Sequence, residues 1–188
     1  HGSRRRRPPR PAGGATGVTA GIIRFHATNE AVNLQRIGLT LTNTASSSAT
    51  DIVQVSLWDG ATQIGTATFL GSATSATSTL SSPLLIPKDG DKDITVKVDL
   101  AQIGVGQSGT QGALIAVDSN ATVDSTGTQG TGVSSGNTIN ATGSTAVQGV
   151  RMFRSLPTFA ADTLSSSGVG DGKLMRFKIT ANSAGNVG

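Results

Sequence analysis

The stretch "DITVKVDLAQIG", residues 93–104, decides the fold class of this chain. Over its first eight residues, polar side chains alternate strictly with four apolar ones, Ile94, Val96, Val98 and Leu100. Successive side chains of a β-strand point to opposite faces, so this period of two predicts a strand with one buried face.

The same period recurs from Val18 onward, and no window of a dozen residues shows the helical spacing of apolar positions. In "IIRFHA", residues 22–27, Ile23, Phe25 and Ala27 are predicted to face inward. The strands in "NLQRIGLTLTN" and "DIVQVSLWDG" are predicted to bury Ile37, Leu39, Leu41, Val53, Val55 and Leu57. The second of them ends in Asp-Gly, a pair typical of a hairpin turn.

Four other segments are less regular. Residues 72–82 are predicted as an edge strand or a loop, because Leu80 is their one large apolar residue. "GALIAVDS", residues 112–119, is apolar almost throughout and is predicted as a central strand. Residues 127–143 are predicted as a loop or thin hairpin, and residues 146–156 as the last strand.

The composition agrees with extended structure. The chain has 25 Thr, 21 Ser and 25 Gly but no Cys, so the fold needs neither helices nor disulfides. The absence of Cys also excludes thiolate metal sites and cysteine nucleophiles. We expect an all-β, antiparallel, immunoglobulin-like β-sandwich with a flexible basic N-terminal arm and an extra C-terminal strand.

The C-terminal strand nearly repeats the first one. Arg24, Phe25 and Thr28 recur at an offset of 152 residues, within "RFKIT" at 176–180. We interpret this as one β-module followed by the first strand of another. Without the rest of its module, that strand would fray, fold back onto the parent sheet or complete the sheet of a neighbouring copy as a donor strand. Its apolar face would consist of Leu174, Met175, Phe177 and Ile179, equivalent to Ile23, Phe25 and Ala27 in the first strand. The predicted segments are an arm at 1–16, a sandwich at 17–156, a linker at 157–172 and this strand at 173–188.

The positive charge is concentrated in the arm. Five of the 15 basic residues lie in the first ten positions, and the other ten are balanced by 11 acidic residues. The arm could bind a polyanion through phosphate groups, but a cleavage site, a linker scar or a leftover of expression is favoured. The arginines concerned are Arg4, Arg5, Arg6, Arg7 and Arg10.

Few residues suggest chemistry, and no catalytic residue, cofactor or metal is assigned. His26 lies on the outward face of a predicted strand, which favours a solvated side chain over a catalytic base. Asp89, Asp91 and Asp93 have the alternate spacing of a calcium loop but lack its glycine and its closing glutamate, so a solvated turn is favoured.

Carbohydrate is the other ligand considered. Trp58, beside the Asp-Gly turn, is the one tryptophan that could stack on a sugar, although such a residue more often packs on its hairpin. Asn120 and Asn140 each begin an Asn-Ala-Thr glycosylation signal in a predicted loop.

Several stretches are similar to a known group of proteins. "FHATNEAVNLQRIGLTLTN", "VSLWDGATQIGTAT", "LLIPKDGDKDITVKVDL" and the "MFRSLPTF" exit resemble the Thr/Ser-rich tandem β-sandwich modules of bacterial secreted, S-layer-like or adhesin-like surface proteins. The resemblance covers residues 18–188 and implies an extracellular scaffold without catalytic residues. The arginine-rich start lies outside it.

We therefore expect a noncatalytic structural module of a surface layer, adhesin stalk or filament that is secreted or cell-surface, without a membrane span. Its expected partners are copies of itself or neighbouring modules. The alternative is a binding module for glycan, through Trp58, or for a polyanion, through the arginine arm. Nucleic acid is the least expected partner.

Overall fold

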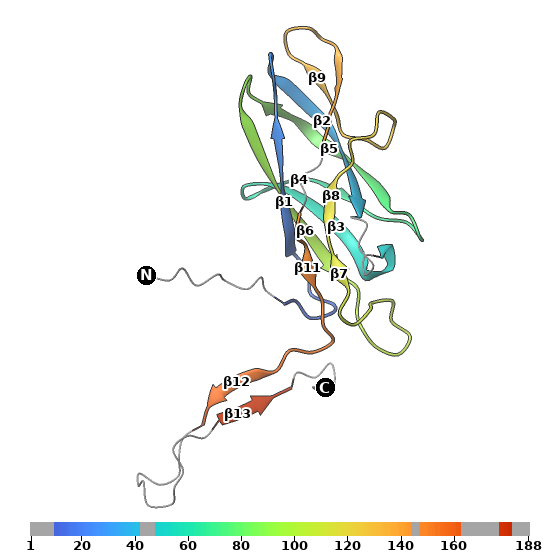
Figure 1. Cartoon of the computed structure of the whole chain (residues 1–188), viewed down its shortest axis with the longest axis vertical. Coiled ribbons are helices and arrows are strands. Elements are labelled where there is room, and N and C mark those ends of the chain that lie inside the picture. The colour runs from blue at the N-terminus through green and yellow to red at the C-terminus, as the bar shows by residue number, and fades with distance from the viewer. Residues whose placement is uncertain (1–9, 42–47, 144–146, 163–176, 182–188) are drawn as a thin grey trace, which may run out of the picture.

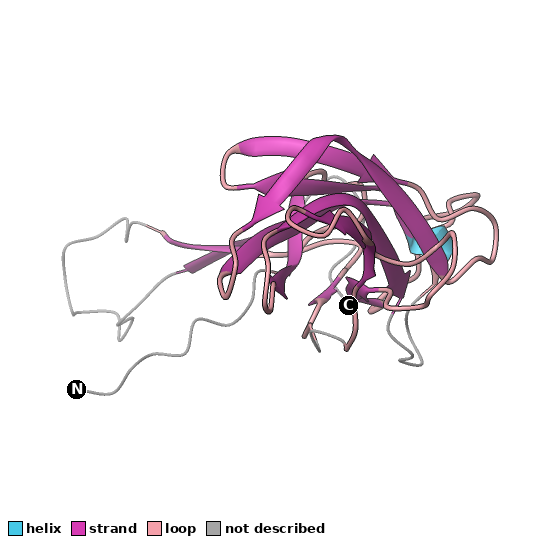
Figure 2. Cartoon of the chain, turned by 90° about the horizontal axis from the view of Figure 1, so that it is seen from above, coloured by secondary structure: helices cyan, strands magenta, loops and turns pink. Residues whose placement is uncertain are grey.

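The computed structural model describes residues 10–41, 48–143, 147–162 and 177–181. Within these ranges the chain forms strands and a single turn of 3-10 helix, η1, at Ala49–Asp51 (Figure 2). Nothing helical in the described part is long and apolar enough to cross a bilayer. The predicted all-β class is confirmed.

Two antiparallel sheets pack against each other as a sandwich (Figure 1). The first sheet has the order β1 (Val18–His26), β6 (Asp91–Leu100), β3 (Ile52–Asp59), β4 (Thr62–Ala67). The second has the order β10 (Thr138–Asn140), β9 (Gln129–Gly132), β2 (Val32–Leu41), β5 (Ser75–Ile86), and β8 (Val117–Ser119) also pairs with β2.

The core lies between the sheets and follows the predicted alternation. Ile94, Val96 and Val98 of β6 are completely buried, and Leu100 is 2% exposed. Each such side chain contributes about 1.5–3 kcal/mol on burial. The other predicted inward residues found buried are Ile23, Phe25, Ala27, Ile37, Leu39, Leu41, Val55 and Leu57.

Only part of the strand order matches an immunoglobulin domain. β2 lies beside β5 and β3 beside β6, as the second and fifth and the third and sixth strands do in that fold. However, β1 lies beside β6 instead of β2, and β4 lies beside β3 instead of β5. The immunoglobulin-like arrangement therefore does not extend to these outer strands.

One predicted core residue faces the solvent. Val53 is 58% exposed, whereas its neighbour Ile52 is 6% exposed. The ladder between β3 and β6 shifts register between Ile52 and Gln54, which places Val53 in a β-bulge. The extra residue interrupts the alternation, so the prediction for Val53 was wrong.

The apolar run at 112–119 is two short strands, not the single central strand predicted. β7 (Leu114–Ile115) pairs with β11 (Val150–Arg151), and β8 pairs with β2. Ile115, Ala116 and Val117 are all at most 1% exposed, because the chain is enclosed on both sides as it passes between these pairs. The last strand predicted at 146–156 is correspondingly reduced to β11.

The two ambiguous segments adopt one of their predicted forms. β5, which contains most of 72–82, is the edge strand of the second sheet. Residues 127–143 contain the thin hairpin of β9 and β10.

Between β8 and β9 the chain leaves β2 and forms a loop, residues 120–128. Thr128 and Asn120 close the loop at its base through a backbone hydrogen bond of 2.9 Å. The Arg36 side chain donates to the carbonyl oxygens of Gly127 (2.9 Å) and Asp124 (2.8 Å). The Arg36 side chain therefore holds the loop against β2.

The C-terminal strand forms a separate hairpin. β12 (Thr158–Ala161) pairs antiparallel with β13 (Phe177–Thr180) outside the sandwich (Figure 1). Residues 158–161 of the predicted linker therefore form a strand. Leu174 and Met175 of the predicted donor strand lie outside the described residues.

Candidate interaction surfaces

The chain enters and leaves the sandwich at the same end, which we call the base. Ala12 and Phe153 form a parallel bridge. The Gly13 amide donates to the Phe153 carbonyl (2.8 Å), and the Phe153 amide donates to the Pro11 carbonyl (3.0 Å). The arm predicted at 1–16 is thus attached to the sandwich from Pro11, while Arg4 to Arg7 lie outside the described residues.

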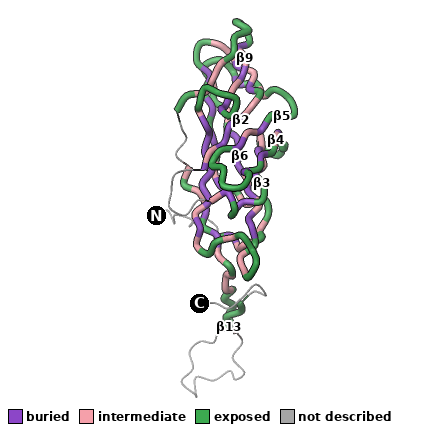
Figure 3. Tube along the Cα trace, turned by 90° about the vertical axis from the view of Figure 1, so that its right-hand side faces the viewer, coloured by how far each residue is buried: buried purple, intermediate pink, exposed green. Residues whose placement is uncertain are grey.

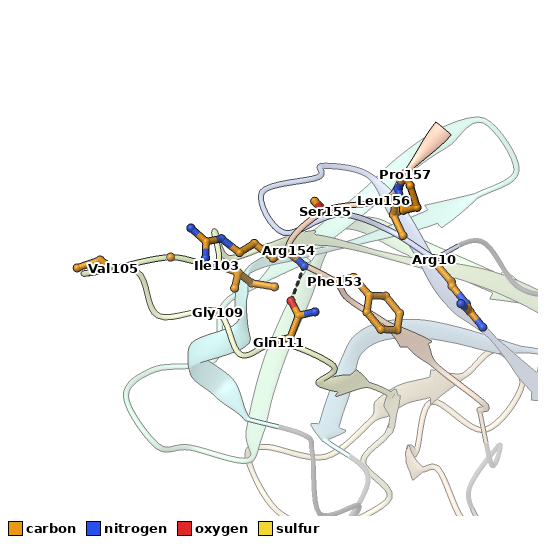
Figure 4. Close-up of a pocket in the computed structure, with 11 residues that line it drawn as sticks. Arg10, Ile103, Val105, Gly109, Gln111, Phe153, Arg154, Ser155, Leu156 and Pro157 are labelled. Carbon is orange, nitrogen blue, oxygen red and sulfur yellow. Dashed lines mark hydrogen bonds between the residues drawn. The ribbon is translucent and has the colours of Figure 1, made fainter. Parts of the chain in front are cut away.

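A groove of about 780 Å³ lies at the base (Figure 4). Its walls include the apolar side chains of Ile103, Phe153 and Leu156. The Arg10 guanidinium lies 5.6 Å from the centre of the Phe153 ring, and the Arg154 amide donates to Gln111 Oε1 (2.6 Å). A groove of this size with cationic and apolar walls has the dimensions of a ligand site.

The β12–β13 hairpin extends from the base and has one apolar face. Phe159 lies opposite Ile179, and Ala161 lies opposite Phe177, so these four side chains share a face. Phe159 is 68% exposed, Phe177 59% and Ile179 51%. In Figure 3, β13 is exposed along its length, whereas buried residues alternate with intermediate and exposed ones along the sandwich strands. We call this surface the hairpin face.

The opposite end, the tip, consists of the turns at 27–31, 87–90 and 133–137, which are hydrogen-bonded to one another. The Asn29 amide donates to Asp89 Oδ1 (3.2 Å). The Glu30 carboxylate accepts from the amides of Ser134 (2.9 Å) and Ser135 (3.0 Å) and from the Ser135 hydroxyl (2.8 Å). These bonds hold the β1–β2 turn to the β9–β10 turn.

The hydrogen bonds from Ser135, followed by the one from Ser134, lower the pKa of Glu30. A carboxylate with a lowered folded-state pKa stabilises the fold above its unfolded pKa, about 4.3, and loses this effect as the pH falls through the folded value.

We predict that Glu30→Gln lowers the melting temperature at pH 7 and that this difference from the wild type shrinks at an acidic pH below the lowered folded-state pKa, where the wild-type carboxylate is protonated. Thermal melts at both pH values test this. Ser135→Ala, which removes only one of the three hydrogen bonds, should show the same trend with a smaller amplitude. An equal loss for Glu30→Gln at both pH values would contradict the prediction.

A small apolar opening, the tip pocket, lies at the tip between β1 and the β9–β10 hairpin. Its volume is about 60 Å³, well below the ~300 Å³ or more of a small-molecule site. It suits the end of a single apolar side chain. Its lining residues are Phe25, His26, Val32, Leu34, Ile86, Gln129, Gly130, Ile139 and Ala141.

The three aspartates considered for calcium are used in other contacts. Asp93 accepts from Arg24 Nε (2.6 Å) and Nη2 (2.8 Å), and Asp91 Oδ1 lies 2.8 Å from His26 Nδ1. Asp89 accepts from the Asn29 amide. No group of three metal-ligating side chains is found within the described ranges. Of the predicted solvated turn, only Asp89 lies in a turn, whereas Asp91 and Asp93 belong to strand β6.

His26 lies where the sequence places it, exposed on the outer face of β1. Its carboxylate partner is Asp91, on the neighbouring strand β6. In the part of the chain that the structure describes, no serine hydroxyl bonds to this imidazole, so the pair does not extend to a nucleophile.

Trp58 is half-buried, and both its indole N–H and its ring make contacts. Its indole N–H donates to Ser56 Oγ (2.9 Å), and Lys97 Nζ lies 4.0 Å from the ring centre. A sugar stacking on the lysine-covered face would have to displace this ammonium group.

Both glycosylation signals were predicted to begin in loops; Asn120 lies in one, at 120–128, whereas Asn140 lies in a strand. Asn120 is 8% exposed, its Oδ1 accepts from the Thr122 amide and hydroxyl, and its Nδ2 donates to Thr126. Asn140 lies in β10 and accepts from Gln129 (3.1 Å). The Asn120 amide is therefore inaccessible in the folded chain.

Comparison with known proteins adds no relative: no family model, no curated protein and no solved structure matches the chain.

Proposed function

We propose that this chain is a noncatalytic structural module of an extracellular surface layer, adhesin stalk or filament, and that it associates with copies of itself or with neighbouring modules. The Ser-, Thr- and Gly-rich exterior and the cysteine-free core are consistent with such a scaffold. Charged groups of the first sheet pair with one another, as in Arg24–Asp93 on its outer face and Lys92–Asp59 near the start of β6.

The hairpin face carries this proposal. Burying a large apolar side chain contributes about 1.5–3 kcal/mol, and three of them are more than half exposed on this face. An isolated two-stranded hairpin is marginally stable in water, because it has only one layer. A partner that covers Phe159, Phe177 and Ile179 would stabilise the hairpin as well as the complex.

The alternatives have less support. The ammonium group of Lys97 lies over the Trp58 ring, and the indole N–H of Trp58 donates to Ser56, which disfavours sugar stacking on this ring. For a polyanion, the favourable feature is the position of Arg10 beside the base groove. This feature involves only one of the five arm arginines. The hairpin face, in contrast, has three large exposed apolar side chains on one surface.

We predict that the wild-type chain associates as its concentration rises, and that the double variant Phe159→Lys/Ile179→Lys remains monomeric, because two ammonium groups would replace the apolar contacts. Sedimentation velocity over a concentration series measures this, and electron microscopy shows the form of the assembly. Ile22→Lys is the matched control, since Ile22 is 52% exposed but lies on the sandwich. Wild-type monomers at every concentration would contradict the proposed function.

A further inference from the structure

We propose that the hairpin face of one copy docks on the tip pocket of the next copy, so that the chains associate head to tail. This inference rests on the proposed function and names the two surfaces that meet. The donor side chains are Phe159, Phe177 and Ile179, and the acceptor is the opening between β1 and the β9–β10 hairpin.

The two surfaces lie at opposite ends of the molecule. The hairpin leaves the sandwich at the base, next to β11, whereas β9 and the end of β1 mark the tip (Figure 1). One chain cannot place its own hairpin on its own tip in this arrangement. Contact between unlike surfaces of two copies is heterologous, so it repeats and generates a linear assembly unless the rotation closes a ring.

The tip pocket offers a matching apolar lining. Phe25, Leu34, Ile86 and Ile139 form its walls, and its volume of about 60 Å³ suits a side-chain end such as that of Ile179 or Phe177. The pocket lies at the edges of both sheets, because β1 ends the first sheet and β10 ends the second. Edge strands are the common place for an added strand or hairpin to bind.

The sequence repeat supports the same partner. β13 carries Phe177 and Lys178 where β1 carries Phe25 and His26. In the sandwich, Phe25 is 8% exposed and lines the tip pocket, and His26 lies beside Asp91. Phe177 of β13 is thus a side chain of the kind that this end of the core already packs.

The charges of the two ends also favour this contact. The tip carries more acidic than basic residues, and the base with its hairpin carries more basic than acidic ones. The residues toward the tip are Glu30, Asp59, Asp89, Asp91 and Asp93 against Arg24, Lys88 and Lys92. The base residues are Arg10, Arg151, Arg154 and Lys178 against Asp51, Asp99 and Asp162. Opposite charges steer the unlike ends together and disfavour contact between like ends.

Docking of the paired hairpin disrupts less structure than replacement of β1 by a donor strand. β1 pairs with β6 from Val18 to His26, and Ile23 is 1% exposed behind that ladder. A donor strand would have to open this ladder and also leave β12. The docked hairpin keeps both pairings.

The test uses two full-length variants with opposite defects. Phe159→Lys/Ile179→Lys removes the donor, and Ile139→Lys places an ammonium group at the acceptor; Ala141→Lys is a second acceptor variant in case Ile139→Lys is misfolded. Circular dichroism and melting confirm that each variant is folded. We expect each variant alone to associate about 30-fold or more weakly than the wild type, the loss typical of one hot-spot residue.

The decisive measurement is the equimolar mixture of a donor variant and an acceptor variant. The mixture should form a one-to-one dimer, because one intact hairpin meets one intact pocket, and it should not grow further. Sedimentation velocity with one variant fluorescently labelled shows this directly. Acceptor variants that assemble like the wild type, or a mixture that remains monomeric, would overturn the head-to-tail contact while leaving self-association intact. A monomeric wild type would overturn the proposed function itself.

Discussion

Ile94→Ala should lower the free energy of unfolding by about 2–5 kcal/mol, the range measured for large-to-alanine changes in cores. Ile94 is completely buried on β6, between β1 and β3, and lies directly opposite Ile23 of β1. The substitution removes apolar contacts and leaves a cavity between two sheets whose backbones are fixed by their ladders. Urea denaturation followed by tryptophan fluorescence measures the change.

The matched control is Ile22→Ala on the neighbouring strand. Ile22 is the same residue type but points outward and is 52% exposed. Its loss should remain below about 1 kcal/mol, as for most surface substitutions. Equal losses for the two variants would show that the first sheet does not face the core as described.

Gly38→Ala should destabilise the chain by about 3 kcal/mol or more, the upper range for overpacking. Gly38 is a buried residue of β2 at the base of the 120–128 loop. An added Cβ would overlap the Thr126 carbonyl oxygen and lie 2.8 Å from Gly127 Cα, both of them backbone atoms. Relief would require the loop to leave β2, which would break the Thr128 Oγ1 contact with the Gly38 amide (3.0 Å).

Gly104→Ala is the control for this substitution. A Cβ at Gly104 would meet only Gln107 Cγ, at 3.7 Å, an ordinary contact with a flexible side chain. Its effect should therefore be within about 0.5 kcal/mol of the wild type. Thermal and urea unfolding of both variants decides the point, and a Gly38→Ala protein as stable as Gly104→Ala would contradict the close approach of the loop.

The sequence predicts the strands of this fold well where one face of a strand is buried and the ladder is regular. β6 is the clearest case, because its four apolar residues alternate without a break. Val53 shows the limit: a bulge changes the face of one residue without changing the composition of the strand. The run at 112–119 shows a second limit of sequence-based prediction. A segment that is enclosed on both sides is apolar at every position, so its sequence does not reveal which strands it pairs with.

The surfaces were harder to predict because they join distant residues. The alternate aspartates resemble a calcium loop in one dimension, but Arg24 and His26 lie across the ladder from Asp93 and Asp91. The pairing of β12 with β13 joins residues on opposite sides of a Ser- and Gly-rich stretch, which reads locally as a linker. The repeat of β1 in β13 was the one local signal that pointed to an additional apolar surface.

The parallel bridge between Ala12 and Phe153 has a mechanical consequence. If the chain is pulled from both sides, the applied force passes from the incoming segment at 10–13 to the outgoing segment at 152–157 through this short contact. Because the two segments run parallel, opposite pulls load their hydrogen bonds in shear, together instead of one after another. Tension along a linear assembly would therefore not load the two sheets, which would remain folded until the contact between residues 10–13 and 152–157 breaks.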